Sequence, residues 1–143
     1  MRRGLPIAAI ILAGCLTVLG GDAALDDLIK RAEAASVADR PSLYVDVAER
    51  QLKAADSLYG EGKVDEARAA VRDVVIYSAK AHDAAMQSGK KLKGTEISLR
   101  KMAAKLRDMK RTLNFEDQPP VQAAADGLEN LRTDLLGKMW PGK

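Results

Sequence analysis

The sequence is poor in cysteine, histidine and aromatic residues, and each shortage excludes a class of protein. Cys15 is the only cysteine among 143 residues, so no intrachain disulfide can hold the fold together. A single histidine, His82, cannot build a histidine-rich metal site. Aromatic residues make up 3%, and the apolar residues are mainly Ala, Leu, Val and Met, a composition that favours helices over strands.

The chain also lacks a strong excess of either charge. It has 23 Lys and Arg against 20 Asp and Glu, which is not the basic excess typical of nucleic-acid-binding proteins, so we expect no nucleic-acid partner. There is no Cys-x-x-Cys-His motif for covalent haem. Gly60-Glu61-Gly62 follows a predicted helix, whereas a phosphate-binding loop follows a strand, so we expect no cofactor.

The first 24 residues have the layout of a secretory signal peptide. Arg2 and Arg3 provide the positive start, residues 5–19 form an uncharged and largely apolar run, and small residues follow at positions 20, 21, 23 and 24. The run is short for a membrane-spanning helix, which needs roughly 20 apolar residues. We predict a signal peptide at 1–24 and a helical domain at 25–143, exported to the periplasm in a soluble or lipid-anchored form.

Three interpretations of how the N-terminal segment is processed remain open. Leu12-Ala13-Gly14-Cys15 resembles the lipobox of bacterial lipoproteins, which makes Cys15 a candidate lipidation site. The alternative is ordinary signal peptidase cleavage after Ala23, where small residues occupy the required positions. A third interpretation is an anchor that is not cleaved.

The remaining chain has helical periodicity and no strand-like alternation. We expect helices at 25–36, 39–60 and 121–139, with a long apolar repeat between the second and third of these. In this repeat, fifteen uncharged positions alternate steps of three and four, as in a heptad pattern. We call these positions the seam: Val64, Ala67, Val71, Val74, Ser78, Ala81, Ala85, Ser88, Leu92, Thr95, Leu99, Met102, Leu106, Met109 and Leu113.

The seam predicts an all-α fold, an elongated antiparallel bundle of about four helices. Because the 3–4 phase continues across Gly89 and Gly94, we predict one long helix at 64–113, straight or bent. Each glycine costs about 1 kcal/mol relative to alanine in a helix interior. The alternative is therefore a break near 89–94 that gives a compact up-down bundle.

One hairpin within this region resembles a tetratricopeptide repeat. Ala55, Leu58, Gly62, Ala67 and Val71 fall close to its small, apolar and turn positions, over one repeat of about 34 residues. The usual early Trp is replaced by a glutamine, and no second copy follows, so the resemblance implies a helical hairpin but no solenoid. A helical hairpin with a glycine turn and no relation to that family explains the same residues.

The polar residues predict neither a catalytic site nor a metal site. His82 lies beside seam position Ala81, and we expect a surface or boundary residue without chemistry. The acidic pairs at 26–27, 65–66 and 116–117 lie at predicted helix starts, where carboxylates favour the positive end of the helix dipole. We therefore expect a protein that is not an enzyme.

The strongest remaining signal is basic. Residues 90–111 contain nine Lys and Arg against two acidic residues, and Lys93, Arg100 and Arg107 recur every seven residues away from the seam. We call these three the ridge and regard it as a candidate anion-binding surface, with an anionic membrane surface as one partner. The other interpretation is a solvated helix face that is partly neutralised by acids on other helices.

Two functions are consistent with this sequence. We expect an exported, non-enzymatic scaffold or interaction protein of the bacterial cell envelope, with a protein partner or self-association. The alternative is a periplasmic binding protein or holdase for anionic or unfolded ligands, using the ridge together with Met102 and Met109.

Overall fold

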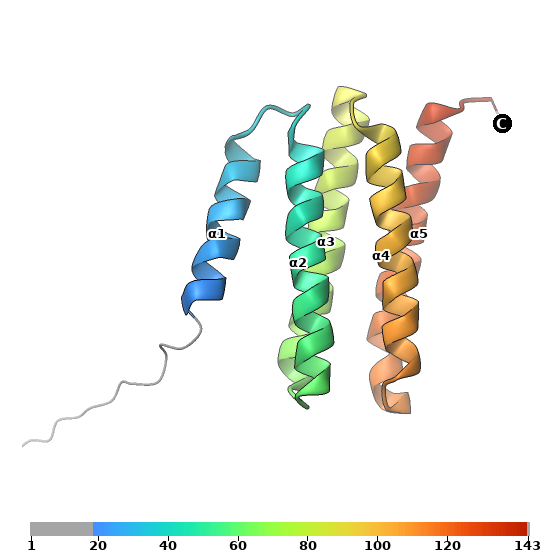
Figure 1. The fold of residues 1–143 in the computed structure, drawn as a ribbon. Coiled ribbons are helices and arrows are strands. Elements are labelled where there is room, and N and C mark those ends of the chain that lie inside the picture. The colour runs from blue at the N-terminus through green and yellow to red at the C-terminus, as the bar shows by residue number, and fades with distance from the viewer. Residues whose placement is uncertain (1–18, 143) are drawn as a thin grey trace, which may run out of the picture.

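The computed structural model describes residues 19–142, and these form an all-α antiparallel bundle, as predicted (Figure 1). The helices are α1 (Leu19–Ala34), α2 (Arg40–Gly60), α3 (Val64–Ser88), α4 (Leu92–Arg111) and α5 (Gln118–Met139), with a short 3-10 turn η2 (Phe115–Asp117) before the last. Consecutive helices run in alternating directions, because the connections between them are short (Figure 1).

Two helical hairpins make the core of the bundle. α2 packs mainly against α3 and α4 mainly against α5, and the hairpins meet through α3 with α5 and α2 with α4. The order around the bundle is therefore α2, α3, α5, α4, which places the consecutive helices α3 and α4 diagonally. α1 packs on α2, where buried Leu28 and Ala32 cover its outer side.

The seam forms one side of the hydrophobic core. Each of its fifteen positions is buried or half-buried, and the largest fully buried side chains include Leu99, Leu106 and Val74. α5 contributes Val121, Leu128 and Leu135 from the other side. Burial of these apolar side chains, at roughly 25 cal/mol per Å² of apolar surface, is the main force that holds the helices together.

The single helix predicted for 64–113 is wrong, and the alternative break near 89–94 is correct. α3 ends at Ser88, and the chain reverses through Gly89 (φ 71°) and Lys91 (φ 63°), both in the left-handed region. The seam keeps its phase across the turn, where Ser88 and Leu92 are both half-buried and Leu92 packs against the core. The uninterrupted 3–4 spacing therefore indicates that α3 and α4 bury residues in the same core, and it does not indicate a continuous helix.

The two glycines of this region are expected to respond in opposite directions. Gly89→Ala should lower the free energy of unfolding by about 1 kcal/mol, because a left-handed conformation disfavours a Cβ atom. Gly94→Ala should raise it by up to about 1 kcal/mol, since Gly94 lies within α4 and a Cβ there meets open space. Denaturant unfolding of both single variants measures the two effects, and stabilisation by Gly89→Ala would contradict the turn.

The other helix ends follow local chemistry. α2 begins at Arg40, with Pro41 in the first turn as predicted. α5 begins at Gln118, earlier than predicted, with Pro119 and Pro120 in its first turn. Proline is tolerated there because the backbone N–H that it lacks would have no hydrogen-bond partner within the helix. The hairpin that resembles a tetratricopeptide repeat is formed by α2 and α3, with Gly62 (φ 78°) in its turn.

The predicted signal peptide lies mostly outside the described residues. Cys15 and the apolar run to Val18 are not described, so the candidate lipidation site lies outside the structure. α1 begins at Leu19 and therefore includes the last residues of the predicted signal segment 1–24.

Candidate functional site

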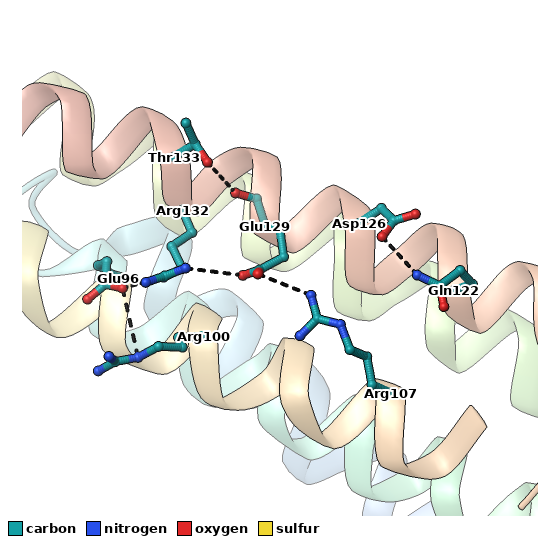
Figure 2. A network of polar contacts seen from close by, with 8 residues as sticks. All are labelled: Glu96, Arg100, Arg107, Gln122, Asp126, Glu129, Arg132 and Thr133. Carbon is teal, nitrogen blue, oxygen red and sulfur yellow. Dashed lines mark hydrogen bonds and ion pairs between the residues drawn. The ribbon is translucent and has the colours of Figure 1, made fainter. Parts of the chain in front are cut away.

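The ridge lies on α4, and the structure places its three members in different surroundings. Figure 2 shows two of them, Arg100 and Arg107. Arg107 forms an ion pair with Glu129 of α5, with 3.1 Å between Nη2 and Oε2. Arg100 Nε lies 3.9 Å from Glu96 on its own helix. Lys93 is exposed and forms no ion pair with any residue that the structure describes. Two of the three ridge residues thus lie within ion-pair distance of a carboxylate.

A buried carboxylate connects the ridge to α5. The side chain of Glu96 is 8% exposed and accepts a hydrogen bond from Arg132 Nε, and Arg132 also lies 3.6 Å from Glu129 (Figure 2). The hydrogen bond from Arg132 to Glu96 raises the pKa of the guanidinium above its ordinary value. We call Glu96, Arg100, Arg107, Glu129 and Arg132 the α4–α5 network, and it fixes the outer edges of the two helices to each other.

The charge pattern of residues 90–111 did not reveal the role of Glu96, which is one of the two acidic residues in that basic segment. Glu96 follows seam position Thr95, just as His82 follows Ala81 and Ala103 follows Met102, and all three following residues are buried. The buried stripe is thus wider than the seam alone. Position beside the seam does not by itself identify such a residue, because Arg72, Lys93 and Arg100 also directly follow seam positions and are exposed.

The ridge charges are expected to differ in their effect on stability. Arg107→Glu should lower the free energy of unfolding by about 1 kcal/mol, because it replaces a pair between two helices with repulsion from Glu129. Lys93→Glu should change it by less than about 0.5 kcal/mol, as for an ordinary surface site. Chemical denaturation compares the two variants, and equal losses would show that the Arg107–Glu129 pair contributes nothing specific.

Other basic side chains of α4 are also paired. Lys105 lies 3.5 Å from Asp56 of α2, and Arg111 lies 2.9 Å from Asp108. Lys110 donates a hydrogen bond of 2.7 Å to Gln122 of α5. Carboxylates of α2, α4 and α5 therefore pair with four of the basic residues of α4, Arg100, Lys105, Arg107 and Arg111, whereas Lys110 has a neutral partner.

His82 is more buried than a surface residue and joins two helices. It is 9% exposed, and its Nδ1 lies 2.8 Å from Asp83 Oδ1. Since an ionised carboxylate only accepts, Nδ1 carries the proton of this hydrogen bond. Nε2 lies 3.3 Å from Asp134 of α5, in an orientation that does not make a hydrogen bond. Both carboxylate side chains are largely exposed.

An open apolar groove of about 500 Å³ runs between the N-terminal halves of α3 and α5. The α5 residues that line it are small: Pro120, Ala123 and Ala124. Ile76 is 48% exposed at its edge, unlike the seam residues of the same helix. The lining includes Val71, Arg72, Val75, Ile76, Pro120 and Ala123.

Ionisable residues with shifted pKa values do not gather in one place. Burial is the main cause that raises the pKa of Glu49 in the middle of α2, and the nearby carboxylate of Asp46 adds to it. Burial likewise raises the pKa of Tyr59 in the last turn of α2, and that of Tyr77 on α3, which stacks on Tyr44. Shifted pKa values often mark active sites when they cluster, and these three are explained by separate packing environments.

Comparisons of the chain with known protein families, with curated proteins and with solved structures find no match. Within residues 19–142, no helix combines the length and apolar character needed to cross a bilayer. In the same part of the chain, no group of three or more His, Cys, Asp or Glu side chains could hold a metal ion. Two surface features of residues 19–142 bear on a function: the α3–α5 groove and the exposed, unpaired Lys93 near the start of α4.

Proposed function

We propose that this protein is an exported, non-enzymatic scaffold or interaction protein of the bacterial cell envelope. The observation that carries the proposal is the α3–α5 groove with exposed Ile76 at its edge. A large aliphatic side chain at the rim of an apolar groove, with charged residues around it, is typical of a protein contact surface. Export is supported by the positive, apolar and small segments of residues 1–24.

The binding-protein or holdase alternative has weaker support. Met102 and Met109 are each 3% exposed and belong to the core, so they offer no adaptable surface to an unfolded ligand. Arg100 and Arg107 of the ridge are engaged by Glu96 and Glu129. An anionic headgroup would have to compete with these carboxylates for two of the three ridge charges.

A photo-reactive phenylalanine analogue at position 76 tests the proposal in intact bacteria that express the full chain. Irradiation should give a defined protein adduct in the envelope fraction, because position 76 lies at the contact surface. The same analogue at Lys53, an exposed position on α2, is the matched control and should give none. Equal labelling from both positions, or no adduct from position 76, would contradict the groove as a contact surface.

Intact mass of the envelope protein tests export in the same cells. A mass that lacks the first residues of the chain is expected, either with lipid on Cys15 or with a start after Ala23. A cytoplasmic protein that retains Met1 would contradict export.

A further inference from the structure

The outward face of α3 carries residues whose chemistry is complementary about a central point. Arg72, Ile76, Ala79 and Asp83 lie along it, and we call these four residues the α3 outer face. Ile76 and Ala79 are equidistant from a point between residues 77 and 78, and so are Arg72 and Asp83. A basic residue on one side of that point thus corresponds to an acidic one on the other, and a large apolar residue to a small one.

We propose that the α3 outer face and the adjoining groove bind a second copy of this chain, with the two α3 helices antiparallel about a twofold axis. This inference rests on the proposed function and names its partner. A twofold axis through the point between residues 77 and 78 brings Arg72 of each copy opposite Asp83 of the other. It also places Ile76 of each copy against Ala79 of the other, so a protruding side chain meets a small one.

The charges on this face are available for such a contact. Arg72 is exposed and has no ion pair with any carboxylate in residues 19–142. Asp83 contacts His82 through one oxygen, yet its side chain is 76% exposed. Asp134 of α5 lies on the other side of the His82 ring and is 62% exposed, which adds negative charge near Asp83. An arginine that pairs with a carboxylate makes directional, charge-assisted hydrogen bonds.

The same geometry disfavours the other orientation. A parallel arrangement would place Arg72 against Arg72 and Asp83 against Asp83, and like charges in direct contact oppose association. The charged positions 72 and 83 are 11 residues apart, about 16 Å along a helix. Two antiparallel helices that cross at about 20° stay in contact over this length, so both charge pairs can form together.

Charge reversal provides a test that exploits the symmetry. The wild-type chain should form dimers in analytical ultracentrifugation, with a dissociation constant that rises with salt because the charge pairs lie at the surface. Arg72→Asp alone, or Asp83→Arg alone, should raise that constant about tenfold to a hundredfold, because symmetry converts two attractive contacts into repulsive ones. Arg50→Asp, a matched change at an exposed position on α2, should have no effect.

Mixing the two single variants is the decisive arm. In a heterodimer of Arg72→Asp with Asp83→Arg, each substituted residue faces a residue of opposite charge, so the mixture should dimerise about as tightly as the wild type, although each variant alone dimerises more weakly. The double variant in one chain should dimerise for the same reason. Ile76→Asp should abolish dimers in every background, because it buries a charge. Circular dichroism of each variant checks that the fold is retained.

Several outcomes would overturn the inference. A wild-type chain that stays monomeric at millimolar concentration would do so, as would dimers that neither Arg72→Asp nor Ile76→Asp weakens. An adduct at position 76 whose mass is not twice that of the chain would preserve the proposed contact surface but assign it to another protein. The absence of any adduct there would remove the contact surface itself, so the two failures can be told apart.

Discussion

Replacing Arg132 with alanine is expected to lower the free energy of unfolding by about 2–4 kcal/mol, because it leaves a buried carboxylate without its main partner. Glu96 is 8% exposed and depends on Arg132 for its hydrogen bond. Arg100, at 3.9 Å, lies too far away to replace that bond. Denaturant unfolding monitored by circular dichroism measures the loss.

Two controls identify the cause of this loss. Arg111→Ala removes an arginine paired with Asp108 on an exposed face, and it should change stability by less than about 0.5 kcal/mol. The double variant Glu96→Gln with Arg132→Met should lose less than Arg132→Ala alone, since no buried charge remains. If Arg132→Ala behaves like Arg111→Ala, the α4–α5 network does not hold the two helices together.

Truncation of Leu106 to alanine is expected to cost about 3–5 kcal/mol. Leu106 is fully buried within the core cluster, so its removal loses apolar burial and also leaves a cavity that rigid helices fill only in part. Thermal and denaturant unfolding both measure this effect. As long as the variant folds, its helical circular-dichroism signal should equal that of the wild-type protein.

Leu136 of α5 is the matched control for this truncation. It is half-buried, and the same change to alanine should cost about 1 kcal/mol, because solvent can fill the space that the side chain leaves. Similar losses at positions 106 and 136 would contradict the burial difference between them. They would also argue against the seam as the inner side of the bundle.

Local sequence signals predicted the helices and their buried side well. The seam identified the inward-facing residues of α3 and α4, and Pro41 marked the first turn of α2. The single helix at 64–113 failed because a short turn at 89–91 leaves the 3–4 phase unchanged. Gly89 and Gly94 both signalled a break, but only the backbone geometry shows that Gly89 forms the turn and that Gly94 is helical.

The candidate surfaces were predicted less completely than the fold. The seven-residue spacing of Lys93, Arg100 and Arg107 places them on one helix, as the structure has them, but it does not show which of them pair with carboxylates. The groove was missed altogether, because it depends on small α5 residues such as Ala123 lying beside Val75 and Ile76 of α3. The spacing of residues within one helix does not predict which residues of another helix lie beside it.

The sequence by itself determined the all-α class, the positions of most helix ends and the side of each helix that faces inward, because these depend on neighbours within a few residues. Only the tertiary structure decided that α3 and α4 lie diagonally, that Glu96 is buried against Arg132, and that Arg72 and Asp83 share an outward face beside an apolar groove. Glu96 and Arg132 are separated by 36 residues. Contacts at such separations follow from how the helices pack in space, and the local pattern of the chain does not encode them.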